Sequence, residues 1–139
     1  MFAEALVCLA LNVYHEARDQ PFIGQVAVAQ VVMNRVRDDR YPDDVCDVVM
    51  QGPTYSWKPD FPVRHRCQFS WYCDGKSDKT PDQTAWEQAL MIAQGVHTGN
   101  LDDFVEGATH YHATYVLPEW AESKVPVVQI GEHVFYRWD

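Results

Sequence analysis

The segment LNVYHEARDQPFIGQVAVAQ, residues 11–30, joins a cluster of ionisable side chains to a long apolar run. His15, Glu16 and Arg18 place three ionisable groups within four positions at the start of that run. The simplest interpretation is the solvated end of a helix. The alternative is chemical, because burial beside an apolar helix raises the pKa of a carboxylic acid, and Glu16 is placed to experience that effect.

Helices are predicted on both sides of this cluster. Residues 2–18 form the first. Residues 23–37, IGQVAVAQVVMNRVR, are apolar on nearly every face until Asn34 and Arg35. Fifteen residues without a break favour a helix over a strand, and the lack of a polar face predicts that this helix is central and buried.

The middle of the chain, residues 38–83, is rich in Pro, Asp, Gly and aromatic residues and shows no sustained period. We expect a long irregular segment, and segments of this length within a compact domain are usually functional. At its end, Thr80-Pro81-Asp82-Gln83 combines a capping box that begins at Thr80 with Pro at the first helical position. The pattern predicts a third long helix that stops near Gly99.

The spacing of apolar and polar residues changes after this helix. Residues 109–116, THYHATYV, alternate in polarity, and residues 127–138, VVQIGEHVFYRW, predict two short strands around a Gly-Glu turn. The sequence therefore predicts an α+β fold, mainly helical, with a small antiparallel β element near the C-terminus. A chain of 139 residues is expected to form one domain, residues 1–139.

Charge and hydropathy limit the possible partners. The chain has 20 acidic and 11 basic residues, a formal net charge of −9, so we expect no nucleic-acid partner. No apolar run reaches the length of a membrane span, so we expect no membrane insertion. The N-terminal segment carries Glu4 where a secretory signal would carry Lys or Arg, and no small-residue cleavage site follows. We therefore expect no signal peptide.

The four cysteines are Cys8, Cys46, Cys67 and Cys73, and none of them forms a CxxC pair. A zinc-ribbon spacing is therefore absent. Cys67 and Cys73 could close a small disulfide loop, which would leave Cys8 to pair with Cys46. Four reduced, buried thiols are the open alternative.

Two histidine patterns invite a metal site. His15-Glu16 begins like a zincin motif, but that motif requires a histidine where this chain has Asp19. His110 and His112 would share one face of a strand, and a ligand from the preceding loop, His65 or Cys67, could complete a site. Paired histidines on a strand more often pack or form hydrogen bonds, so we expect no metal.

Other catalytic patterns are weak. Ser70 lacks the context of a nucleophilic serine, and the seven glycines are scattered rather than gathered in a phosphate-binding loop. We therefore expect no cofactor.

The carboxylates carry the stronger signal. A glycosidase needs a carboxylic acid whose pKa is raised by burial, so that it can donate a proton to the departing glycosidic oxygen. Glu16 fits that requirement. Asp19, three positions later, would lie about 5 Å away on the same helix face. A catalytic pair must flank the bond, so Asp19 is better interpreted as a solvated or capping residue.

Two stretches have the composition of a sugar-binding groove, in which aromatic faces meet pyranose rings and polar groups reach their substituents. CQFSWYCDG, residues 67–75, mixes polar side chains with aromatic ones, and residues 110–115, HYHATY, do the same. Ordinary core aromatics are the alternative for each stretch. The presence of both favours a groove lined by Gln68, Phe69, Ser70, Trp71, His110, Tyr111 and His112.

The chain resembles the cell wall hydrolases of the spore cortex-lytic SleB type from about residue 6 to the C-terminus. The resemblance rests, in order, on YHEAR, GQVAVAQVVMNRV, CQFSW, a helix and GATHYHATYV. YHEAR and the following GQVAVAQVVMNR are its most specific parts. The extra cysteines around CQFSW and the HYH stretch depart from cortex-lytic members and resemble a subgroup found in phages and Gram-negative bacteria.

This resemblance implies a lysozyme-like, lytic-transglycosylase-like catalytic domain that acts on the glycan strands of peptidoglycan. The family's essential acid, the Glu of its E-A-R element, matches Glu16. Its Q-F-S element matches Gln68, Phe69 and Ser70, which would line the groove.

Two routes of cleavage stay open. In a lytic transglycosylase no second carboxylate is needed, because the muramic 6-hydroxyl attacks its own anomeric carbon and Glu16 returns as the base. A hydrolytic muramidase would need a second acid, for which Asp60, Asp74 and Glu106 are candidates.

Two other functions are also open: a zinc amidase or peptidase with His110 and His112 as ligands, or a wall-binding module without catalysis. We expect a monomer that acts in the periplasm or cell wall. Without a signal peptide it would be made in the cytoplasm and released by another factor, as a phage endolysin is by a holin, unless a leader has been removed.

Overall fold

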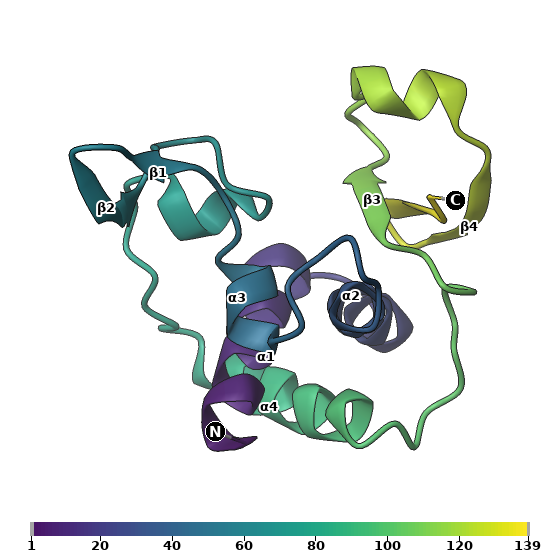
Figure 1. The fold of residues 1–139 in the computed structure, drawn as a ribbon. Coiled ribbons are helices and arrows are strands. Elements are labelled where there is room, and N and C mark those ends of the chain that lie inside the picture. The colour runs from purple at the N-terminus through teal and green to yellow at the C-terminus, as the bar shows by residue number, and fades with distance from the viewer. Residues whose placement is uncertain (1, 139) are drawn as a thin grey trace.

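Helix α2 (Phe22–Val36) lies at the centre of the molecule, shown in Figure 1. The structure is a computed structural model that describes residues 2–138. One side of α2 packs into a core with the other helices through Val26, Ala29, Val32 and Met33. Another side packs against the C-terminal part of the chain through Ala27, Val28 and Val31. Burial on both sides explains why the helix has no polar face, and it confirms the predicted buried helix.

Helix α1 (Phe2–Ala17) packs against α2 and against α4 (Gln83–His97). Its fully buried residues Leu9 and Val13 belong to the helical core, and Tyr14 is 2% exposed. Side chains of this size each contribute roughly 1.5–3 kcal/mol when fully buried. Helices over residues 2–18 and 23–37 are confirmed to within one residue at each end.

The start of α4 differs from the prediction. Its N-cap is Asp82, whose side chain accepts a hydrogen bond from the backbone N–H of Ala85 at 3.1 Å, and not Thr80. The backbone N–H of Asp82 donates to the Tyr14 hydroxyl at 3.1 Å, which ties the non-helical cap residue to α1. The predicted end is confirmed, because α4 stops at His97 and Gly99 adopts a positive φ of 76°.

Residues 38–83 are not a single irregular segment as predicted. They contain α3 (Val45–Val49), β1 (Thr54–Tyr55), β2 (Lys58–Pro62) and the 3-10 helix η1 (Ser70–Cys73). Each element has five residues or fewer, too short to show a period in sequence. We call residues 54–79, which begin with the antiparallel β1–β2 hairpin, the hairpin lobe.

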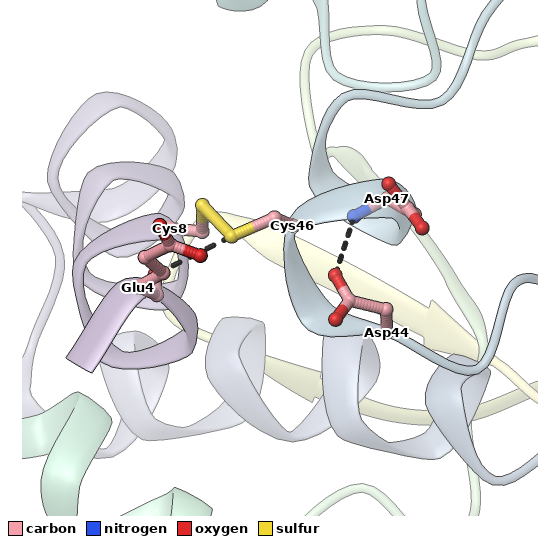
Figure 2. Close-up of a disulfide and its surroundings, with 5 residues drawn as sticks. All are labelled: Glu4, Cys8, Asp44, Cys46 and Asp47. Atoms are coloured by element: carbon pink, nitrogen blue, oxygen red, sulfur yellow. Dashed lines mark hydrogen bonds between the residues drawn. A yellow bond between two sulfur atoms is a disulfide. The ribbon is translucent and has the colours of Figure 1, made fainter. Parts of the chain in front are cut away.

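Two disulfides hold this region. Cys8–Cys46 joins α1 to α3, as Figure 2 shows, with Cα atoms 5.2 Å apart. In the same view the Asp44 side chain caps α3 by accepting a hydrogen bond from the Asp47 N–H at 3.2 Å. Cys67–Cys73 closes a loop within the hairpin lobe. The sequence left open two disulfides or four reduced thiols, and the structure contains the two disulfides.

The C-terminal sheet contains β3 (His110–Ala113), β4 (Pro126–Ile130) and β5 (His133–Tyr136) in the antiparallel order β3-β5-β4. Gly131, with φ of 57°, lies in the predicted Gly-Glu turn between β4 and β5. In the register, Tyr111 lies opposite Phe135, and Phe135 is completely buried against α2. Tyr111 therefore faces the helices.

The fold is α+β and mainly helical, as predicted. In Figure 1 the hairpin lobe and the C-terminal sheet stand apart on the left and right of the view, with helices below and between them. Within residues 2–138, no helix is both long and apolar enough to cross a membrane.

Candidate active site

Glu16 lies in the last turn of α1 and is partly buried. Its Oε1 accepts a hydrogen bond from the hydroxyl of Tyr111 on β3, 95 positions later in the sequence. Burial raises the pKa of Glu16 from its ordinary value, while the Tyr111 hydrogen bond and the positive charge of Arg35 lower it. Burial is the largest effect, so the carboxyl keeps its proton to a higher pH than a free glutamate does.

Tyr111 is the donor in this pair. Burial and the neighbouring Glu16 raise the pKa of Tyr111 well above its ordinary value, so its hydroxyl stays protonated. Its ring is held by aromatic neighbours, with centroids 5.5 Å from Phe135 and 6.5 Å from Phe69. The packing of β3 against α1 and α2 thus directs the Tyr111 hydroxyl toward the Glu16 carboxylate.

Arg35, on α2, is 5% exposed and supports this pair. Its Nε donates to the carbonyl of Thr109 at 2.7 Å, and its Nη1 donates to Oε1 of Gln68 at 3.3 Å. The guanidinium lies 5.0 Å from the ring centroid of Tyr41 and 5.3 Å from that of Phe69. Arg35 therefore connects α2 to the start of β3 and to the hairpin lobe.

The other charged or titratable members of the YHEAR segment make contacts of their own. His15 stacks on Trp71 with ring centroids 4.6 Å apart, and its Nε2 donates to the carbonyl of Asp78 at 3.1 Å. The Arg18 guanidinium lies 4.9 Å from the centroid of the Tyr14 ring. His15 precedes Glu16 within α1, and Arg18 lies directly after the end of that helix. Through its contacts His15 docks the hairpin lobe on α1.

The Q-F-S-W stretch is divided between surface and core. Gln68 and Ser70 are exposed, but Phe69 is 3% and Trp71 8% exposed. The indole N–H of Trp71 donates to Oδ1 of Asn12 at 2.8 Å, inside the helical core. The prediction that Phe69 and Trp71 line a sugar-binding groove is therefore wrong for this arrangement, because their rings are already covered by protein.

The HYH stretch is divided by the alternation of β3. Tyr111 points to Glu16, whereas His110 and His112 contact Trp120 on the other face, at ring centroid distances of 5.5 and 5.7 Å. Burial lowers the pKa of His110 to about 3, so this ring stays neutral. The two histidines do share a face as predicted, but it is not the face that carries Glu16.

His110 and His112 form hydrogen bonds with neighbouring protein groups. His112 donates from Nδ1 to the carbonyl of Ala113 and accepts at Nε2 from the Tyr136 hydroxyl, both at 2.8 Å. His110 Nδ1 lies 2.9 Å from the Thr109 hydroxyl oxygen. In the part of the chain that the structure describes, no three His, Cys, Asp or Glu side chains gather in a metal-binding arrangement. This geometry gives no support to the zinc alternative.

The carboxylates considered for a second acid lie on separate segments. Asp60 is on β2, Asp74 directly follows η1, and Glu106 has a positive φ of 50° in the connection before β3. The Asp74 side chain accepts a hydrogen bond from the backbone N–H of Lys76 at 2.8 Å. Asp19 lies beyond the end of α1. Burial lowers the pKa of His133, and the negative charge of Asp19 partly opposes that effect.

Sequence reasoning missed the role of Arg35 and the pairing of Tyr111 with Glu16. A charged residue in an otherwise apolar, buried helix must be paired, and this signal could have drawn attention to Arg35. The Tyr111–Glu16 pairing depends on how β3 packs against α1, and it has no local signal.

The model of the Cell Wall Hydrolase family matches residues 19–136. Among curated proteins, the spore cortex-lytic enzyme of Halalkalibacterium halodurans is 33% identical over 128 residues, covering 91% of this chain and 33% of the relative. The spore cortex-lytic enzyme of Bacillus subtilis is 28% identical over 127 residues, covering 91% of this chain and 35% of the relative. The chain thus spans about a third of the length of these relatives.

Two solved structures share the fold. The catalytic domain of the Bacillus cereus SleB protein is 26% identical with a TM-score of 0.69, and the match covers 97% of this chain and 91% of that one. The catalytic domain of the germination-specific lytic transglycosylase SleB from Bacillus anthracis is 27% identical with a TM-score of 0.68, covering 96% and 93%. These matches confirm the family resemblance and the fold class that the sequence predicts.

Proposed function

Because the chain belongs to the Cell Wall Hydrolase family, we propose that it cleaves the β-1,4 bond between N-acetylmuramic acid and N-acetylglucosamine in peptidoglycan, with Glu16 as the general acid. The observation that carries this proposal is the partly buried Glu16 carboxyl, which has a raised pKa and one oriented hydrogen bond from Tyr111. An acid whose pKa is raised keeps its proton to a higher pH and can donate it to a leaving oxygen.

We propose the lytic transglycosylase route. Protonated Glu16 gives its proton to the glycosidic oxygen as the bond from that oxygen to the muramic anomeric carbon breaks. The resulting carboxylate takes the proton of the muramic 6-hydroxyl as that oxygen attacks the anomeric carbon, which yields a 1,6-anhydro product and restores Glu16. One carboxylic acid suffices, and the similarity to a catalytic domain named as a lytic transglycosylase supports this route.

The protein contributes charge and position to this cycle. In the carboxylate state Glu16 is stabilised by the Tyr111 hydroxyl and by Arg35, and both oppose the effect of burial on its pKa. Gln68 and Ser70 are exposed, and Gln68 accepts a hydrogen bond from Arg35. We propose both residues as substrate contacts. The target polymer places the action of the protein in the cell wall.

The test is a digestion of purified peptidoglycan followed by mass spectrometry of the soluble fragments. We expect anhydromuramic ends, one water lighter than reducing ends, and we expect release to continue in EDTA. Reducing ends would replace the transglycosylase route by a muramidase with a second acid. Cleavage in the peptide stems, or sedimentation with the wall without any release, would overturn the glycosidase proposal.

A further inference from the structure

The hairpin lobe has a composition unlike the rest of the protein. Residues 54–79 contain five Lys or Arg and three Asp, whereas the remaining residues contain six basic and 17 acidic ones. An acidic protein thus carries one segment with an excess of positive charge. This segment is suited to an anionic ligand.

Aromatic rings are exposed on the same lobe. Trp57, in the turn between β1 and β2, is 75% exposed, and Phe61 on β2 is 50% exposed. The rings of Tyr55 and Trp57 have centroids 5.2 Å apart at 32°, which makes a broad aromatic surface. A single exposed aromatic needs no explanation, but a cluster of them on a two-stranded hairpin suggests a binding surface.

A groove of about 390 Å³ runs beside this surface, lined by Tyr55, Phe61, Arg64, Tyr72, Gly75 and Lys76 among others. Gly75 has a positive φ of 78°, and a Cβ at this position would lie 2.6 Å from the Arg64 guanidinium. The glycine therefore leaves room for the Arg64 side chain to lie along the groove wall. Aromatic and cationic side chains line one open groove.

The groove is connected to the active site through packed rings. The Tyr72 ring lies 6.0 Å from that of Trp71, and Trp71 stacks on His15, the residue before Glu16. Gln68 N–H donates to the Gln51 carbonyl and attaches the lobe to the segment before it, while His65 N–H donates to the Cys73 carbonyl within the lobe, both at 2.9 Å. The groove is therefore attached, through Trp71 and His15, to the end of α1 that carries Glu16.

We propose that the hairpin lobe binds sugar units of the peptidoglycan strand that lie outside the bond being cleaved. Trp57 and Phe61 contact the apolar faces of the sugar rings, and Arg64 and Lys76 pair with carboxylates of the peptide stems. This inference rests on the proposed function, because the ligand is a more distant part of the same substrate. It assigns the recognition of an anionic glycan to a surface remote from Glu16.

Binding is tested first without cleavage. The Glu16→Gln protein is sedimented with insoluble sacculi, alone and with Trp57→Ala plus Phe61→Ala. We expect the double substitution to raise the half-saturating concentration of sacculi about tenfold, equivalent to about 1.4 kcal/mol. Met91→Ala removes a side chain that is 58% exposed on α4 and serves as the matched control. Equal binding by the hairpin variant and the control would overturn the proposal.

The anionic part of the ligand is tested on two kinds of sacculi. Arg64→Gln plus Lys76→Gln should weaken binding to native sacculi several-fold and should have no effect when the stem carboxylates have been amidated chemically. Arg37→Gln, an exposed charge on the C-cap of α2, is the control. A loss of equal size on both substrates would exclude carboxylate recognition.

Activity separates this inference from the proposed function. In the wild-type background, the Trp57 and Phe61 substitutions should raise KM for long glycan strands and leave kcat unchanged. Fragment release by the wild type together with unchanged KM in the variant would overturn only the inference. Binding that depends on the hairpin, in a wild type that releases no fragments, would overturn only the proposed function. Elution as a dimer that the hairpin substitutions convert to a monomer would overturn the inference in favour of self-association.

Discussion

Glu16 experiences two opposing influences on its pKa. Desolvation favours the protonated carboxylic acid, whereas the Tyr111 hydroxyl and the Arg35 guanidinium favour the carboxylate. In the proposed mechanism Glu16 first donates and then accepts a proton, so influences of both signs on its pKa bear on the two steps. The same balance makes specific substitutions informative.

Glu16→Gln should reduce the rate of fragment release about 10³-fold, because the amide cannot transfer the proton and general acid catalysis contributes roughly 10²–10⁴. The fold should be kept, since the Gln carbonyl can still accept from Tyr111. The measurement is the initial rate on purified peptidoglycan. Strong residual activity in a variant of normal stability would exclude Glu16 as the acid.

The same substitution should stabilise the protein at neutral pH. The pKa of Glu16 is higher in the folded than in the unfolded chain, so the folded state binds more protons and the wild type loses stability as pH rises above about 4.5. Gln does not titrate. Urea unfolding should therefore give a larger advantage for the variant at pH 7 than at pH 4, and an advantage that shrinks with rising pH would contradict the raised pKa.

Tyr111→Phe should move the alkaline limb of the profile of kcat/KM against pH to higher pH. The hydroxyl lowers the pKa of Glu16, so its removal raises that pKa and keeps the acid protonated further into the alkaline range. Tyr136→Phe is the control, because the Tyr136 hydroxyl bonds His112 on the opposite face of the sheet. Coincident profiles for the two variants would show that the Tyr111 hydroxyl does not act on the catalytic acid.

At this scale the sequence singles out Glu16 as the proposed acid but does not reveal the residues that contact it. Glu16 has a local signal, an acid at the junction of a polar cluster and an apolar helix. Tyr111 is 95 positions away, and nothing in its neighbourhood distinguishes it from His110 or His112 until strand alternation places it on the inner face. The aromatic residues Phe69 and Trp71 mislead for a related reason, since composition does not reveal which side of a short element is buried.

Among the elements, α3 and the hairpin lobe depend most on covalent support. Helices and hairpins this short are not stable alone. Cys8–Cys46 joins α3 to α1, and Cys67–Cys73 closes a loop within the hairpin lobe. The long helices have the opposite character, with a sustained pattern that extends over fifteen or more residues. This contrast explains why the bounds of α1 and α2 follow from the sequence while α3, β1, β2 and η1 do not.

Replacing Cys8 and Cys46 together by Ser should cost about 4 kcal/mol of unfolding free energy, and replacing Cys67 and Cys73 about 2 kcal/mol, because the closed loops differ in length. The sequence separations are 38 and 6 residues. Urea unfolding of both variants, each the control for the other, measures the difference. Equal losses, or a wild type whose midpoint does not change under reduction, would contradict this account.

At the scale of the whole molecule, α2 joins parts of the chain that lie far apart in the sequence. Its apolar sides join the helical core to the C-terminal sheet. Near its C-terminal end, Arg35 bonds Gln68 of the hairpin lobe and the Thr109 carbonyl next to β3. The relative placement of Glu16, Tyr111 and the lobe thus depends on one buried guanidinium, and sequence periodicity predicts the helix without revealing this connection.

Arg35→Met should therefore lower both stability and activity. Its apolar side chain would leave the buried Thr109 carbonyl without a partner, which costs about 1–3 kcal/mol, and it would remove a positive charge that lowers the pKa of Glu16. The alkaline limb of kcat/KM should move upward, as for Tyr111→Phe. Arg35→Lys keeps the positive charge but lacks the planar guanidinium with its several N–H donors. The Lys variant should therefore lose stability but shift the pH profile of kcat/KM less than Arg35→Met does.

Arg37→Met, two positions away at an exposed site, provides the matched control, because it removes the same charge from the same helix end. Urea unfolding and pH profiles of the three variants separate the two roles of Arg35. Loss of stability without a shift in the profile would mean that Arg35 only joins the parts of the fold. A shift in the profile without loss of stability would mean that its charge acts on Glu16 while other contacts hold the lobe and β3 in place.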